Sequence, residues 1–99
     1  MMNFILNFFR VNDILKEDKI TRTYGDSSVE VLFYLKKDRQ KLIFEMTANK
    51  IKDNKVVATQ TTKYDKFNVD EQEAAELLFD INKEQINEME ESDLEFLFI

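Results

Sequence analysis

Apolar and polar residues alternate through the middle of the chain with the period of two that is typical of a half-buried β-strand. Residues 28–37 are the clearest case, because Val29, Val31, Phe33 and Leu35 fall on one face. Residues 42–48 repeat the pattern, with an apolar side chain at every second position. Since successive side chains of a strand point to opposite sides, each segment predicts a strand with one buried face.

Two further strands are predicted, one on each side of this pair along the chain. Residues 19–24 are a short candidate, and residues 55–64 form a Thr-rich candidate suited to a sheet edge. The dipeptides 25–26 (Gly-Asp) and 53–54 (Asp-Asn) have the residue types of tight hairpin turns. Residues 36–41 contain five charges and predict a solvated loop. The four strands in chain order predict an antiparallel β-meander.

Helical spacing of apolar residues appears on both sides of the predicted sheet. In residues 3–16, Phe4, Phe8, Val11 and Leu15 recur on one face and predict an N-terminal helix. Residues 69–91 predict a longer and strongly amphipathic C-terminal helix, with acidic residues in its first turn. Its expected buried face consists of Ala74, Ala75, Leu78, Ile81, Ile86 and Met89. Its expected solvent face consists of Glu73, Glu76, Asp80, Glu84, Asn87 and Glu91.

The last residues, 93–99, form an apolar tail in which Leu94, Phe96 and Phe98 alternate as one face of a strand does. Such a segment can add a short C-terminal strand, fill the core or enter a partner, and all three options stay open at this point. We therefore predict one α+β domain over residues 1–99: a four-stranded antiparallel meander flanked by an N-terminal and a C-terminal helix.

The residue composition excludes several kinds of chemistry. The chain contains no Cys and no His, which removes disulfides, thiolate nucleophiles, the usual zinc ligands and any Ser-His-Asp arrangement. A single glycine cannot build a Gly-rich phosphate loop. Paired carboxylates remain available for hydrolysis, but no motif selects a pair. We expect no enzyme activity and no cofactor, with a carboxylate-dependent hydrolase as a distant third reading.

A calcium-loop spacing is present between residues 80 and 91. Asp80, Asn82, Glu84, Glu88 and Glu91 match the ligand positions of such a loop, but Gln85 replaces the required glycine. The segment also has helical periodicity, and a helix cannot wrap these side chains around one ion. We predict no metal site.

The apolar residues at positions 1–9 are too few for a membrane-spanning helix, which needs about 20. Arg10, Asn12 and Asp13 end the run. We therefore expect no membrane span, and the absence of Cys agrees with a cytoplasmic protein.

Charge is distributed very unevenly along the chain. Residues 70–95 contain eleven acidic residues and one basic residue, a net charge of −10, whereas the other residues carry +4. A dense acidic helix can bind a basic or nucleic-acid-binding protein surface, or it can simply be a solvated face that keeps a small apolar domain soluble. Tyr24, Tyr34 and Tyr64 lie near basic residues in the predicted sheet, but the net charge of −6 opposes direct nucleic-acid binding.

No motif assigns the chain to a family. In its length, its lack of catalytic residues, its residue composition typical of an AT-rich genome and its acidic run, it resembles the small acidic inhibitors of phages and mobile elements, which include anti-CRISPR proteins and DNA mimics. The resemblance implies a non-enzymatic binding protein that blocks or redirects a host macromolecule. The alternative is an assembly subunit that forms homo-oligomers through its apolar termini. The candidate partner-binding residues are Glu73, Glu76, Asp80, Glu84, Glu91, Phe96 and Phe98.

Overall fold

Four strands in chain order form one antiparallel sheet in the computed structural model, which describes residues 13–99. The strands are β1 (Asp13–Tyr24), β2 (Ser27–Asp38), β3 (Lys41–Lys52) and β4 (Lys55–Asn68). The predicted antiparallel meander is therefore confirmed. Each strand extends beyond its predicted bounds, because cross-strand pairing continues through polar residues that carry no alternating pattern.

The predicted N-terminal helix over residues 3–16 lies mostly outside the described residues. Where the structure describes it, the prediction is wrong, because residues 13–16 belong to β1 and pair with the end of β2. Pairing with the neighbouring strand, which helical spacing cannot reveal, determines the structure of this part.

Tight two-residue turns connect the strands. At the first turn Gly25 adopts a positive φ of 57°, a conformation that glycine tolerates without strain. Asp53 and Asn54 both have positive φ, as a type I′ hairpin turn requires. The predicted solvated loop at 36–41 is instead mostly strand, because Asp38 pairs with Lys41 and leaves only Arg39 and Gln40 in the turn.

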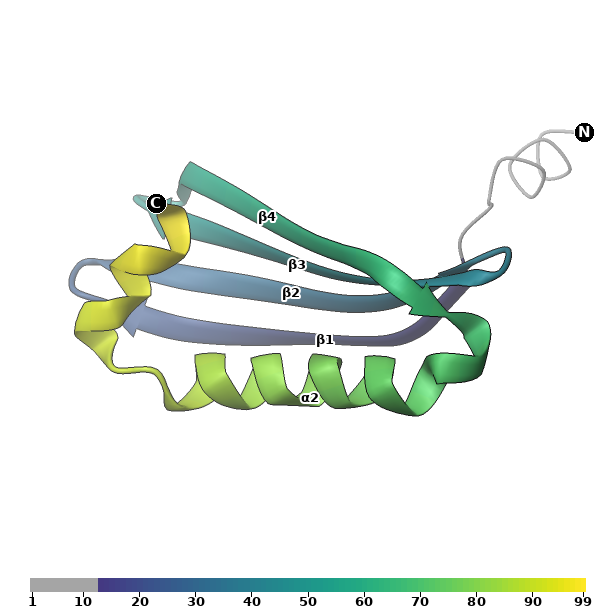
Figure 1. The fold of residues 1–99 in the computed structure, drawn as a ribbon. Coiled ribbons are helices and arrows are strands. Elements are labelled where there is room, and N and C mark those ends of the chain that lie inside the picture. Colours follow the sequence, from purple (N-terminus) through teal and green to yellow (C-terminus); the bar gives the residue numbers. More distant parts are fainter. Residues whose placement is uncertain (1–12) are drawn as a thin grey trace, which may run out of the picture.

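The α-helix α2 (Gln72–Glu88) follows the short 3-10 helix η1 (Val69–Glu71) and lies along one face of the sheet (Figure 1). The predicted C-terminal helix is confirmed, with narrower bounds than 69–91. At its start, the backbone N–H of Asn68 donates to Oε1 of Glu71 at 2.9 Å. At its end, Met89 turns to extended backbone with ψ of 139°, which stops the helix.

The hydrophobic core lies between α2 and the two central strands. The alternating residues Val29, Val31, Phe33 and Leu35 of β2 are all fully buried, as predicted. From the helix, Phe79 is inserted between two sheet phenylalanines, with ring centroids 6.0 Å from Phe33 and 6.2 Å from Phe44 in edge-to-face geometry. Such aromatic pairs stabilise the packing beyond the area that they bury.

Arg22 of β1 holds the end of α2 against the sheet. Its Nη1 donates to the carbonyl oxygen of Ile86 at 2.6 Å, and its Nη2 donates to that of Met89 at 2.7 Å. The last carbonyls of a helix have no partner within the helix, and a cation there also offsets the helix dipole. Arg22 therefore determines where α2 ends on the sheet.

The apolar tail forms a 3-10 helix, η2 (Glu91–Phe98), at the end of the sheet where β1 turns into β2 (Figure 1). The option of a short C-terminal strand is therefore wrong. With three residues per turn, Leu94 and Leu97 share one side of η2. Leu94 is fully buried and Leu97 packs against the core. Phe96 turns away from the core and is 66% exposed, so the alternation of residues 94, 96 and 98 did not identify the buried face.

We predict that Phe79→Ala destabilises the fold by about 3–5 kcal/mol, because it leaves a cavity between Phe33 and Phe44. Urea unfolding followed by circular dichroism measures the loss. Leu77→Ala on the exposed side of the same helix is the control, with an expected change within about 0.5 kcal/mol. Equal losses for the two variants would contradict the packing described here.

The tail gives a second stability prediction. Leu94→Ala should cost about 2–5 kcal/mol, since its side chain is completely buried. Phe96→Ala removes a larger but exposed side chain and should change stability by less than about 1 kcal/mol. Thermal unfolding of the two variants compares them directly, and a greater loss for Phe96→Ala would show that η2 is seated differently.

Candidate protein-binding surface

The side of α2 that faces the sheet is set by Phe79 and not by the apolar group expected from the sequence. Ala75, Phe79 and Ile86 are buried, while Leu78 and Met89 are half-buried. Ala74 and Ile81, which were expected to be buried, are exposed. The prediction from the sequence gave every apolar residue of the helix the same weight. Burial of the bulky Phe79 side chain is the most favourable, so α2 is rotated with Phe79 toward the sheet.

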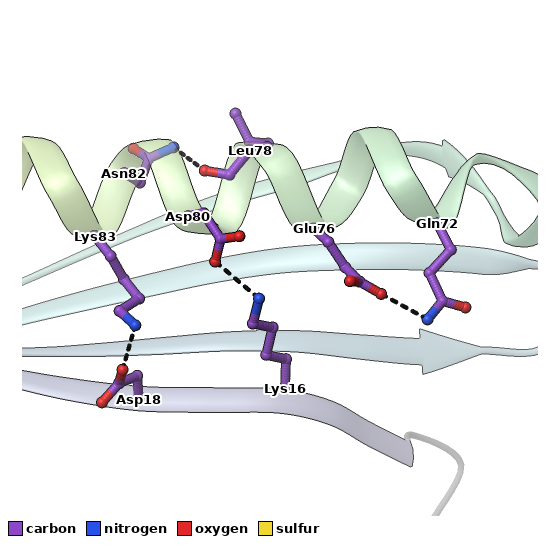
Figure 2. Close-up of polar contacts among 8 residues, drawn as sticks. All are labelled: Lys16, Asp18, Gln72, Glu76, Leu78, Asp80, Asn82 and Lys83. Atoms are coloured by element: carbon purple, nitrogen blue, oxygen red, sulfur yellow. Dashed lines mark hydrogen bonds and ion pairs between the residues drawn. The ribbon is translucent and has the colours of Figure 1, made fainter.

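One flank of α2 faces β1, and it carries two of the predicted partner-binding residues. Asp80 Oδ1 accepts a hydrogen bond from Lys16 Nζ at 2.8 Å, and Lys83 forms an ion pair with Asp18 (Figure 2). Glu76 lies on the same flank and accepts from Gln72 Nε2 at 2.8 Å. Asp80 therefore contributes to the contact between α2 and β1 while its side chain stays 56% exposed. Glu76, whose hydrogen-bond partner lies in α2 itself, is half-buried. Asp80 and Glu84 are thus exposed as expected, whereas Glu76 is only partly so.

Glu91 and Phe98 also have intramolecular contacts. Oε1 of Glu91 accepts a hydrogen bond from the backbone N–H of Gly25 at 3.1 Å, which joins η2 to the first turn. Phe98 packs against the core. Of the predicted residues, Glu73, Glu84 and Phe96 are exposed and form no side-chain hydrogen bond or ion pair among residues 13–99.

The exposed side of α2 carries a continuous stripe that the sequence analysis did not identify. We call it the outer stripe, and its residues are Glu73, Leu77, Ile81, Glu84 and Glu88. Leu77 is 59% exposed and Ile81 is 42% exposed, although both are large aliphatic side chains. Residues three and four apart are neighbours on a helix surface, so the two form one apolar ridge with a carboxylate at one end and two at the other.

The carboxylates of the outer stripe are electrostatically uncompensated. Within residues 13–99, Glu73, Glu84 and Glu88 form no ion pair, and Lys83, the only base of α2, is turned toward Asp18. By contrast, Asp80 on the inner flank and Glu95 in η2 have basic partners, Lys16 and Lys50. Leu77 and Ile81 are therefore flanked by three carboxylates that have no ion-pair partner among residues 13–99.

The remaining surfaces offer less specific chemistry. An open crease of about 480 Å³ between β1 and α2 is lined by residues that include Asp18, Asp80, Lys83 and Glu84, and the first three are held in the ion pairs already described. Among residues 13–99, no group of three or more acidic side chains is arranged to hold a metal ion. In that same part of the chain, no helix has the length and apolar character needed to cross a membrane.

The three tyrosines considered for nucleic-acid stacking do not form one platform. Tyr24 and Tyr64 lie on the sheet face that carries α2, opposite Ser27 and Phe44 in the strand register. Tyr34 lies on the other face, with Lys36 Nζ 5.2 Å from its ring centroid. A single strand could not stack on all three side chains at once.

Comparison of the chain with models of known protein families, with curated proteins and with solved structures gave no match. The function of the protein is therefore inferred from its surfaces.

The ion pair between Lys83 and Asp18 gives a pH-dependent prediction. Hydrogen bonds from Lys83 and from the backbone N–H of Lys19 lower the pKa of the Asp18 carboxyl. A lowered folded-state pKa stabilises the fold at neutral pH, and this stabilisation is lost as the pH falls through that pKa. Asp18→Asn should therefore reduce stability near pH 7, and this loss should be smaller at about pH 2, below the ordinary pKa of a carboxyl.

Urea unfolding of both proteins at the two pH values measures the effect. Glu73→Gln, which removes an exposed carboxylate without an ion pair among residues 13–99, is the control. If the difference between wild type and Asp18→Asn is as large in acid as at neutral pH, the ion pair does not contribute as described.

Proposed function

We propose that the protein is a non-enzymatic binding protein whose main contact surface for another protein is the outer stripe of α2. The observation that carries this proposal is the exposure of Leu77 and Ile81, adjacent on a rigid helix and framed by carboxylates. Scattered single apolar residues are common on protein surfaces, whereas contiguous ones mark interaction sites. The fold does not need these two side chains, because Ala75, Phe79 and Ile86 already bury the inner face of α2.

The acidic flanks of the outer stripe support the same function. Charges at the rim of an interface increase the rate of association and select partners of opposite charge. The sequence-based proposal that binding blocks or redirects a host macromolecule is compatible with this surface. The alternative, an assembly subunit, rests on the exposed Phe96 and Ile99 of the tail.

We predict that L77Q/I81Q loses its protein partner while its fold is retained. The full chain is immobilised and used to capture proteins from a low-GC bacterial lysate, and the captured proteins are quantified by mass spectrometry. Because each buried aliphatic side chain contributes about 1.5–3 kcal/mol, the double variant should reduce capture of the specific partner at least tenfold, by rough estimate.

The matched control is V56T/V57T, which removes two equally exposed aliphatic side chains from β4 and keeps their shape. It should capture the partner as the wild type does. Identical capture by all three proteins would contradict the proposed surface. If light scattering detects a regular oligomer of the wild type, and Phe96→Ser converts it to monomer, the result would instead favour the assembly subunit.

A further inference from the structure

We propose that the partner segment that binds the outer stripe is a basic amphipathic helix, with two neighbouring apolar residues framed by Lys or Arg at both ends. This inference rests on the proposed function and specifies the chemistry of the partner. It follows from three properties of the outer stripe: its shape, its charge and the order of its residues.

The shape of the outer stripe favours a helix as the bound element. Glu73, Leu77 and Ile81 follow one another at intervals of four residues, which is a row that forms a ridge along a helix surface. Such ridges pack into the grooves between the corresponding rows of a second helix. Beside the ridge, Ala74 is exposed and small, so the backbone of a neighbouring helix can approach closely.

The charge of the outer stripe selects a basic partner. Glu73, Glu84 and Glu88 are exposed and form no ion pair in the described part of the chain, and Lys83, the only base of α2, pairs with Asp18. A second copy of this chain that docked through the same stripe would bring these carboxylates together, which is unfavourable. The phosphates of a nucleic acid would be repelled in the same way.

The order of residues along α2 specifies the pattern of the partner. The ridge begins with one carboxylate, continues with two aliphatic side chains and ends with two carboxylates. With a rise of about 1.5 Å per residue, Glu73 and Glu88 lie roughly 22 Å apart along the helix axis. An antiparallel or parallel partner helix of about four turns would place a base against each end of the ridge.

The probes are three fluorescent synthetic peptides of about five helical turns each. The basic peptide carries leucines at helical spacing on one face, with Lys and Arg on both sides of them. The acidic peptide has Glu in place of every base, and the third peptide keeps the bases but has Ala in place of every Leu. Binding to the full chain is measured by fluorescence anisotropy at about 50 and 500 mM NaCl.

The basic peptide should bind at least about tenfold more tightly than either of the other two, and high salt should weaken its binding. L77Q/I81Q should weaken the binding of the basic peptide about tenfold or more, whereas V56T/V57T should leave it unchanged. E84K/E88K should reverse the preference between the basic and acidic peptides. Circular dichroism and thermal unfolding establish that each variant remains folded.

Equal binding of the basic and acidic peptides would overturn the inference, and so would binding of the basic peptide that L77Q/I81Q does not weaken. If no basic peptide binds but capture of a protein still depends on Leu77 and Ile81, the outer stripe binds a partner of different chemistry, and only this inference fails. If capture is independent of Leu77 and Ile81, the proposed function fails as well. Self-association of the full chain that L77Q/I81Q abolishes, measured by analytical ultracentrifugation, would assign the stripe to a second copy and overturn the inference.

Discussion

The burial of Phe79 between Phe33 and Phe44 sets the rotation of α2 about its own axis, and the other contacts of the helix depend on that rotation. With Phe79 at the centre of the inner face, Asp80 and Lys83 come within reach of β1, where Lys16 and Asp18 are their partners. The ammonium groups of Lys16 and Lys83 also lie 5.0 and 5.7 Å from the Phe79 ring centroid. The same rotation turns Leu77 and Ile81 outward. One buried aromatic ring therefore determines which residues stabilise the domain and which remain available to a partner.

The sequence was sufficient for the order of the strands, because β2 and β3 alternate buried and outward positions and the turns have residue types with few conformations. The sequence did not predict the full extent of β1 and β4, which are mostly exposed and carry no such alternation. It was not sufficient for the rotation of α2, since helical spacing is compatible with two apolar sides, one containing Ala74 and Ile81 and one containing Phe79. The shape of the sheet surface selects between them. The buried side of the tail could not be predicted from the sequence either, because Leu94 and Phe96 are both strongly apolar. Leu94 is buried and Phe96 exposed because the tail is a 3-10 helix, whose buried side repeats every three residues.

The rotation of α2 also determines which of its acidic residues have basic partners in the sheet. Asp80 on the inner flank of α2 is paired with Lys16 of the sheet, so its charge contributes to the fold and adds little to the field outside it. Acids on the outer side have no such partner among residues 13–99, so their field extends into solvent. The open face of the sheet is different again, because Glu45 lies within 3.5 Å of both Lys36 and Lys63 and the charges there largely cancel. Long-range attraction of a basic protein would therefore act on the helix side of the molecule.

The contact between Arg22 and the end of α2 has a consequence for the synthesis of the protein on the ribosome. Arg22 and Met89 are separated by 67 positions, so the ribosome adds this many residues before the helix can be fixed. At roughly 5–20 residues per second, that interval lasts about 3–13 s. In the later part of this interval, after β3 has been made and before α2 is complete, the apolar faces of β2 and β3 are uncovered, and an incomplete sheet of this kind is prone to aggregate. The nascent chain is thus expected to be a client of ribosome-associated chaperones until α2 has emerged.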